Sequence, residues 1–71
     1  MDIQKVVATN VKKYRKEKGL TQLELARKCG WNSNSNVNRI EVSAISARLD
    51  NLEKIAHALD LTVIDLVEDW S

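Results

Sequence analysis

Segment 34–39, NSNVNR, concentrates polar side chains that can form hydrogen bonds with the edges of DNA bases. An arginine fits the O6 and N7 acceptors of guanine, and an asparagine fits N6 and N7 of adenine; each bidentate pair contributes about 1–3 kcal/mol of discrimination. The candidate base-reading residues are Asn34, Ser35, Asn38 and Arg39. Asn and Ser also serve often as capping and turn residues, and we assign that role to Asn32 and Ser33.

The orientation of these side chains depends on which face of their helix is buried. Each residue of a helix turns by about 100°, so placing Val37 and Ile40 inward fixes the direction of the others. The residues that then face away from the core are Ser35, Arg39 and Val42, with Asn38 on one flank. The helix start, near position 34, is a place where side chains and backbone N–H groups can reach a base edge or a phosphate.

The preceding segment 20–33 predicts a short helix that ends in a sharp turn. Thr21 can cap this helix, and Leu25 and Cys29 then fall on one face. Gly30 supplies a stop that residues with a Cβ tolerate poorly. A short helix, a turn and a polar-faced second helix form the unit that can lay one helix in a DNA major groove. The alternative is an ordinary corner between two helices.

Glu41 falls closer to the inward side of its helix than to the polar side. A carboxylate in that position needs a partner, because burying it alone carries a large desolvation cost. Arg15, which flanks the apolar stripe of the first helix, is the natural candidate. We expect a structural ion pair, and removing one partner of such a buried pair costs about 3–5 kcal/mol.

Size and composition favour a compact all-α bundle of about five short helices, with residues 1–71 forming a single domain. The chain of 71 residues has no proline, two glycines, 44% hydrophobic residues and 4% aromatic residues. So small a bundle is marginal alone, which makes a homodimer plausible. The single cysteine excludes an intrachain disulfide, and no metal motif or cofactor site is evident. No leader peptide and no apolar stretch of about 20 residues is visible, so we expect a cytoplasmic protein without membrane contact.

The net charge of +1 hides an uneven distribution. Residues 1–30 carry eight Lys or Arg and three acids, giving +5, whereas residues 31–71 carry three Lys or Arg and seven acids, giving −4. A basic half beside an acidic half suits a protein that offers one end to phosphate. The alternative is a solvated charge pattern with no partner.

Apolar periodicity and capping residues place the helices. We expect five helices. The first runs from a cap at Asp2 to about Lys18, and the second from a cap at Thr21 to about Lys28. The third runs from a cap at Asn32 or Ser33 to Glu41 or Val42, the fourth covers Leu49–Leu59, and the fifth covers 63–69 after a cap at Thr62. Segment 42–47, VSAISA, fits either a loop or a frayed continuation of the third helix. Glu68 and Asp69 oppose the helix dipole, so the last helix should fray there unless something packs on it.

Four single residues have less specific interpretations. We expect Cys29 to be a buried, inert thiol and Trp31 to be part of the core. His57 should be exposed beside the carboxylate of Glu53, one helical turn earlier. Trp70 either covers a dimer contact or is unpacked.

Together, these residues resemble the Xre family of helix-turn-helix regulators, which includes the lambdoid phage repressors and Cro proteins. The resemblance runs from about Asn10 to Val67. Its matching stretches are NVKKYRKEKGLTQLELARKCGW, VNRIE and LDNLEKIAHALDLTVIDLV. It implies a lambda-repressor-like DNA-binding domain.

The resemblance also implies roles for individual residues. Gln22 matches a glutamine that contacts a DNA phosphate, and Arg48 matches a position that often touches backbone phosphate. Arg15 and Glu41 occupy the places of the family's arginine–glutamate pair. The base-contacting positions correspond to Asn34, Ser35 and Arg39. The expected phosphate contacts are Thr21, Gln22, Asn36 and Arg48.

The chain departs from the family pattern in two places. It has one residue more than usual between Gly30 and Val37, so Ser33 is an alternative to Asn34 in base contact. After RIE the family usually has a glycine, basic residues and a proline, where this chain has VSAISA. That loop should therefore make fewer phosphate contacts than usual.

We hypothesise a sequence-specific DNA-binding transcriptional regulator, in the simplest case a repressor, that binds a pseudo-palindromic operator as a homodimer. Its third helix would enter the major groove of double-stranded DNA, with no small-molecule ligand involved. The alternative is a protein-interaction module on the same scaffold, such as an antitoxin or a phage anti-repressor with a protein partner. An enzyme is not expected, because one His, one Cys and no convergent carboxylate pair provide no catalytic machinery.

Overall fold

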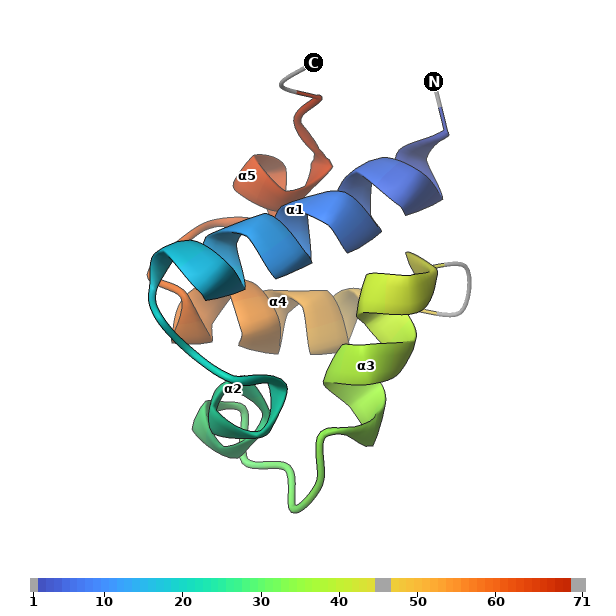
Figure 1. Cartoon of the computed structure of the whole chain (residues 1–71). Coiled ribbons are helices and arrows are strands. Elements are labelled where there is room, and N and C mark those ends of the chain that lie inside the picture. Colours follow the sequence, from blue (N-terminus) through green and yellow to red (C-terminus); the bar gives the residue numbers. More distant parts are fainter. Residues whose placement is uncertain (1, 45–46, 70–71) are drawn as a thin grey trace.

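The computed structural model describes residues 2–44 and 47–69, which form a bundle of short helices (Figure 1). The helices are α1 (Ile3–Glu17), α2 (Gln22–Lys28), α3 (Ser35–Val42), α4 (Leu49–Ala58) and α5 (Val63–Val67). No β-strand occurs within the described ranges, and the predicted all-α class with about five helices is confirmed.

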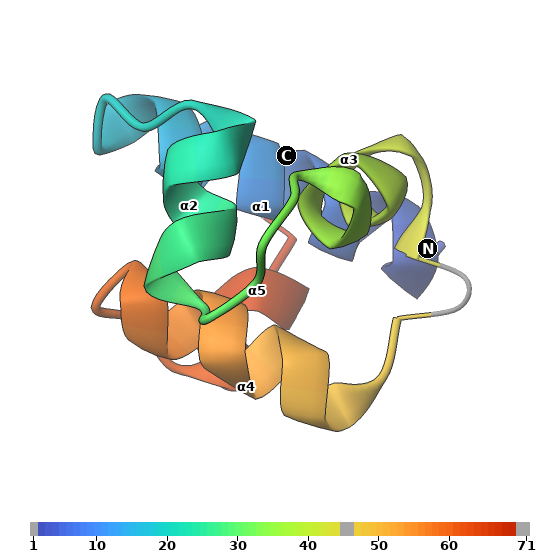
Figure 2. The ribbon, with the colours of Figure 1, turned by 90° about the horizontal axis from the view of Figure 1, so that it is seen from below.

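The helices pack so that α2 and α3 form a unit at one end of the molecule. Helix α1 packs on α3 and α5, α2 packs on α3 and α4, and α4 packs on α5. In Figure 1, α1 lies above α4, and α2 and the start of α3 lie below α4. Seen from below in Figure 2, α2 and α3 lie side by side, joined by the loop at 29–34. This is the predicted pair of helices joined by a turn.

The ends of α1 and α2 follow the predicted capping residues. Asp2 accepts hydrogen bonds from the backbone N–H groups of Gln4, at 3.1 Å, and Lys5, at 3.4 Å. Helix α1 ends before Gly19, whose φ of +70° is the left-handed conformation that glycine adopts most readily. Gly30 has a φ of +84° after α2 and allows the chain to turn toward α3. Both sequence-predicted stops are therefore in place.

The start of α3 differs from the prediction. Neither Asn32 nor Ser33 is its N-cap: Asn34 occupies that position and makes no side-chain capping hydrogen bond. Ser33 instead accepts a hydrogen bond from the backbone N–H of Ser35 at 3.4 Å and donates one to its hydroxyl at 3.1 Å. The extra residue after Gly30 is thus accommodated in the turn, and α3 begins one to two residues later than expected.

Each helix contributes at least one apolar side chain that is fully enclosed in the core. Among them are Val11, Leu25, Val37, Ile55 and Leu66, each at 0% exposure. The first residues of α1 and α4 lie outside this core: Ile3 is 47% exposed and Leu49 is 62% exposed. The core thus lies at the centre of the bundle, where it fixes the rotation of α3.

Helix α5 ends at Val67, two residues earlier than predicted, and Asn10 of α1 binds its open end. The Asn10 side chain is buried and donates its amide to the carbonyl groups of Leu66, at 3.0 Å, and Glu68, at 2.7 Å. The acidic residues beyond Val67 oppose the helix dipole, and Glu68 has an extended backbone. Carbonyl groups that the helix leaves without partners are therefore satisfied from α1.

The remaining single-residue predictions have mixed outcomes. Cys29 is half-buried rather than fully buried, because it lies at the exposed end of α2. Trp31 is also half-buried and packs against the core, and His57 is exposed. Trp70 and positions 45–46 of the VSAISA segment lie outside the described residues. Among the described helices, none has both the length and the apolar character needed to cross a membrane.

Candidate nucleic-acid interface

The side of α3 opposite the core is exposed and polar over most of its length. Val37 and Ile40 are 0% and 4% exposed and hold the helix against the bundle. The four candidate base-reading residues, Asn34, Ser35, Asn38 and Arg39, are all exposed. Val42 ends this face as an apolar side chain that is 76% exposed. The predicted rotation of the helix is therefore the one observed.

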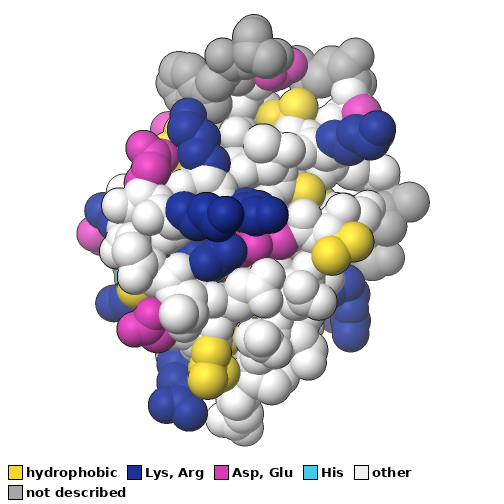
Figure 3. Space-filling model, viewed as in Figure 1, with side chains coloured by type: hydrophobic (Ala, Val, Ile, Leu, Met, Phe, Trp, Pro, Cys, Tyr) yellow, Lys and Arg dark blue, Asp and Glu magenta, His cyan; other side chains and the backbone are white. Residues whose placement is uncertain are grey.

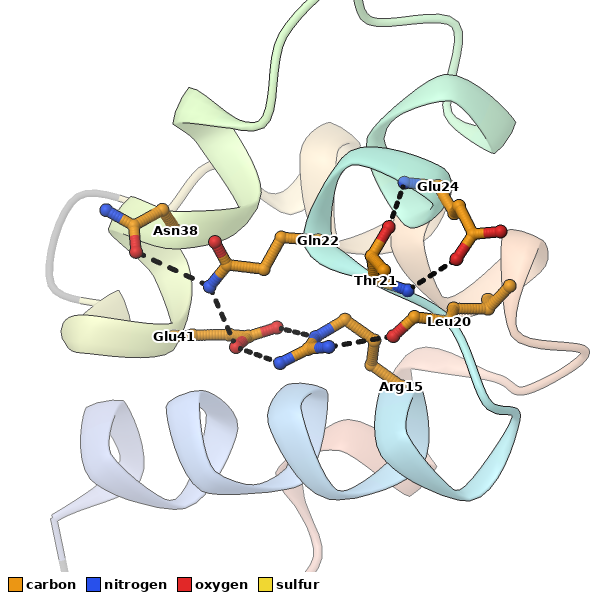
Figure 4. Close-up of polar contacts among 7 residues, drawn as sticks. All are labelled: Arg15, Leu20, Thr21, Gln22, Glu24, Asn38 and Glu41. Carbon is orange, nitrogen blue, oxygen red and sulfur yellow. Dashed lines mark hydrogen bonds and ion pairs between the residues drawn. The ribbon is translucent and has the colours of Figure 1, made fainter.

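An ion pair joins α3 to α1 behind that face. Nε of Arg15 donates to Oε2 of Glu41 at 2.6 Å, and Nη2 donates to Oε1 at 3.0 Å (Figure 4). The side chains are 11% and 4% exposed, so the pair is largely removed from water. Arg15 also donates to the backbone carbonyl of Leu20 at 2.7 Å, which ties in the link between α1 and α2. The two residues expected to form a pair are thus in contact.

Gln22, at the start of α2, is directed toward α3. Its Nε2 donates to Oε1 of Glu41 at 3.2 Å and to Oδ1 of Asn38 at 3.4 Å (Figure 4). Both amide hydrogens thus have acceptors within the protein, whereas a direct side-chain contact with phosphate would need one of them. Sequence reasoning assigned Gln22 to phosphate and gave no sign of this link to Asn38.

Thr21, another expected phosphate contact, forms a capping box with Glu24. The Thr21 hydroxyl accepts a hydrogen bond from the Glu24 backbone N–H at 3.0 Å, and the Glu24 carboxylate accepts one from the Thr21 backbone N–H at 2.8 Å. Hydrogen bonds from Thr21 to the Glu24 carboxylate, first from its backbone N–H and then from its side chain, lower the pKa of Glu24. Thr21 therefore fixes the start of α2 and lies exposed at its tip.

A hollow between α3 and α4 brings together three of the expected DNA contacts. Its volume is about 240 Å³. Its lining residues are Asn36, Arg39, Ile40, Ser43, Ala47, Arg48 and Asn51. The Arg48 side chain is 80% exposed, with Nε 3.7 Å from Oδ1 of Asp50. The guanidinium groups of Arg39 and Arg48 thus flank one polar hollow. Ser43 and Asn51 also line it, although the sequence did not indicate either residue.

Positive charge also gathers over α1. Figure 3 shows a group of Lys and Arg side chains in the middle of the face that α1 crosses. The exposed lysines of α1 and its C-cap are Lys5, Lys12, Lys13, Lys16 and Lys18. One of them, Lys18, lies 3.9 Å from an oxygen of Asp60. Helix α1 belongs to residues 1–30, whose net charge is +5, so this basic surface agrees with the uneven charge distribution of the sequence.

The described part of the chain contains no cluster of three or more His, Cys, Asp or Glu side chains that could hold a metal ion.

The Cys29 thiol is half-buried, and this desolvation raises its pKa to about 11, although the charge of Lys54 opposes the shift. A thiol with so high a pKa is a poor nucleophile near neutral pH. The Cys29 side chain packs against the hydrophobic core at the end of α2.

A model of the helix-turn-helix family matches residues 11–66, which include all of α2, α3 and α4. The chain belongs to this family. Its arrangement of helices is the lambda-repressor-like fold, and the sequence places it in the Xre-type group. The matched region contains the helix-turn-helix unit formed by α2 and α3.

One similar sequence is a Neisseria hypothetical transcription factor from Neisseria meningitidis serogroup B. It is 36% identical to this helix-turn-helix protein over 66 residues, which are 93% of this chain. The chain spans only 61% of the length of that relative. A crystal structure of the hypothetical transcription factor NHTF from Neisseria has a TM-score of 0.89 and 35% identity, and it covers 97% of this chain and 78% of its own.

Two further solved structures have similar folds. The master regulator for biofilm formation SinR, crystallised in complex with DNA, gives a TM-score of 0.78 and 35% identity, covering 87% of this chain and 98% of its own. A point mutant of the restriction-modification controller protein C.Esp1396I gives a TM-score of 0.82 and 27% identity, covering 93% of this chain and 84% of its own. Both are regulators by their descriptions.

Proposed function

We propose that this helix-turn-helix protein is a sequence-specific transcriptional regulator that places α3 in the major groove of double-stranded DNA. The observation that carries the proposal is the exposed face of α3. Arg39 and Asn38 extend from it, while Val37 and Ile40 anchor its other side in the core. A helix held in this way presents base-reading side chains on a rigid support. The DNA-bound crystal structure of SinR, a relative in fold and sequence, supports the same use of this chain.

Phosphate contacts would flank α3 on both sides. On one side lies the start of α2, where the Thr21 side chain is exposed and the backbone N–H of Gln22 is at the helix N-terminus. On the other side lies the hollow lined by Asn36 and Arg48. Contacts with both strands would set the depth and register of α3, whereas Asn34, Ser35, Asn38 and Arg39 would read the bases.

A homodimer on a pseudo-palindromic operator is the assembly that we propose. The protein measures 32 × 23 × 18 Å along its principal axes. Two copies therefore fit on half-sites one turn of DNA apart, about 34 Å. Repression by occlusion of a promoter is the simplest result of such binding.

The proposal can be tested by selecting bound duplexes from a random pool and measuring their affinity at rising salt. We expect one recurring, two-fold symmetric motif whose affinity falls steeply between about 50 and 200 mM salt. An Asn34→Ala, Arg39→Ala double variant should lose the preference for this motif and keep weak, salt-sensitive binding to any duplex. Absence of any salt-sensitive complex would contradict the proposal.

A protein-interaction module is a second candidate, which the exposed apolar residues favour. Val42 is 76% exposed at the end of α3, and Leu49 is 62% exposed at the start of α4. A polar substitution outside α3, Leu49→Ser, should leave DNA selection intact if α3 reads DNA. If Leu49→Ser abolishes binding of a protein partner, and the wild-type protein binds no duplex, the second candidate is the right one.

A further inference from the structure

Four side chains form a continuous hydrogen-bonded series that runs from the interior to the exposed face of α3. It begins at Arg15, passes through Glu41 and Gln22, and ends at Asn38 (Figure 4). The Arg15–Glu41 pair is largely buried, whereas Asn38 is exposed. The series therefore connects a fixed charge to a candidate base-reading residue.

The chemistry of each group fixes the direction of every bond in this series. A guanidinium can only donate and an ionised carboxylate can only accept, so Glu41 must face the amide NH2 of Gln22 and not its carbonyl oxygen. The second hydrogen of that NH2 group is directed at Asn38, which must therefore present an acceptor. Only Oδ1 of Asn38 accepts, and it lies 3.4 Å from Nε2 of Gln22. The orientation of both amides thus follows from the position of Arg15.

We infer that Gln22 is a positioning residue that turns the NH2 group of Asn38 toward the DNA. This inference rests on the proposed function, because it concerns how α3 reads a base. With Oδ1 held by Gln22, Asn38 presents a donor and selects acceptor edges, namely O6 or N7 of guanine, N7 of adenine or O4 of thymine. The same series directs both amide hydrogens of Gln22 to acceptors on α3. Its side chain thereby acts on specificity and not as a phosphate clamp.

The test compares base preference among variants on a panel of duplexes that differ at one base pair. Asn38→Ala identifies the base pair that Asn38 reads. At that pair, Gln22→Ala should lower discrimination by about fivefold, because the Asn38 amide is then free to rotate and one hydrogen bond loses its orientation. Affinity for non-specific duplex should change by less than twofold. In the Asn38→Ala background, Gln22→Ala should have no further effect on preference.

Asn38→Asp gives a reciprocal test. Aspartate still accepts from Gln22 but presents a second acceptor to the groove. Preference at the same pair should move to donor edges, N4 of cytosine or N6 of adenine, with weaker binding overall. Gln4→Ala is the matched control, because Gln4 is also half-buried but lies on α1, outside the series. It should leave preference unchanged.

Two results would overturn the inference and leave the proposed function intact. One is a uniform loss of affinity for all duplexes in Gln22→Ala, which is the behaviour of a phosphate contact. The other is a change of preference at a base pair that Asn38→Ala does not affect. A wild-type protein that selects no motif would instead overturn the proposed function.

Nitrogen-15 relaxation of side-chain amides in the free protein tests the series without DNA. The Asn38 NH2 group should be ordered in the wild type and become mobile on the ps–ns timescale in Gln22→Ala. Equal mobility of that group in both proteins, with unchanged melting temperatures, would contradict the inference. Gln4→Ala should leave the order of the Asn38 amide unaltered.

Discussion

Arg15 on α1 and Glu41 on α3 join through two hydrogen bonds, of 2.6 and 3.0 Å, although they lie 26 positions apart in sequence. The pair holds the exposed face of α3 at a fixed angle to α1. Glu41 also accepts from Gln22, so the same carboxylate links α3 to α2. One carboxylate therefore links α3 to both of its neighbouring helices, α1 and α2.

Replacing Glu41 with alanine should lower the free energy of unfolding by about 3–5 kcal/mol, because Arg15 is left buried without its partner. Urea unfolding followed by circular dichroism measures this. The double variant Arg15→Met, Glu41→Leu should recover a large part of the loss. Glu53→Ala on the exposed side of α4 is the control, expected within about 0.5 kcal/mol of wild type. A loss below about 1 kcal/mol for Glu41→Ala would show that the pair is not structural.

Arg39→Ala should weaken binding to the selected operator about 10- to 100-fold and leave the melting temperature unchanged. The Arg39 side chain is exposed, and among the described residues it has no ion pair whose loss would unfold the protein. Loss of a base contact should also relax preference at one base pair. Fluorescence anisotropy with operator and single-mismatch duplexes measures both effects.

Arg48→Ala is the matched control for Arg39→Ala, since both arginines line the same hollow. If Arg48 contacts phosphate, this variant weakens binding to all duplexes alike and reduces the salt slope by about one. Identical effects of the two substitutions on every duplex would contradict the assigned roles. A large drop in melting temperature for Arg39→Ala would mean that Arg39 is structural.

Asn10→Ala should release the end of α5, because three backbone carbonyls lose their donor. We expect a loss of about 1–3 kcal/mol in the free energy of unfolding. Hydrogen exchange should accelerate first in α5, since its contact with α1 is the one removed. Thr9→Ala, at the exposed neighbouring position, should change neither quantity. Uniform acceleration over all helices would instead indicate a global role for Asn10.

The Cys29 thiol should react slowly with iodoacetamide at pH 8. Burial raises its pKa to about 11 from 9.0, so the folded protein favours the protonated thiol. Its contribution to stability is therefore complete below about pH 9 and is lost as the pH rises toward 11. Alkylation, followed by mass spectrometry, should become faster above about pH 10 in the folded protein. In protein unfolded with urea, it should become faster already near pH 9. Fast alkylation of the folded protein at pH 8 would contradict this assignment.

Most of the fold could be predicted from the sequence because its helix boundaries have local causes. Asp2 and Thr21 cap α1 and α2, and Gly19 and Gly30 follow them with positive φ. The rotation of α3 follows from Val37 and Ile40 by helical periodicity alone. These features need no knowledge of distant residues.

Features that depend on residues far apart in the sequence were missed or misplaced. Nothing near Asn10 indicates that its amide binds carbonyls more than 50 positions away. The link from Gln22 to Asn38 depends on the packing of α2 against α3, which periodicity does not specify. The start of α3 was misplaced because several Asn and Ser residues in a row can each act as a cap or in a turn, and local preference does not choose among them.

The central claim is that the exposed face of α3 is the surface that binds DNA. A titration of nitrogen-15-labelled protein with the selected operator duplex tests it most directly. We predict that the largest amide shifts fall on residues 34–42 and at the start of α2, and that a scrambled duplex of equal length gives smaller shifts there. Shifts concentrated on α4 and α5, with 34–42 unchanged at saturation, would contradict the account.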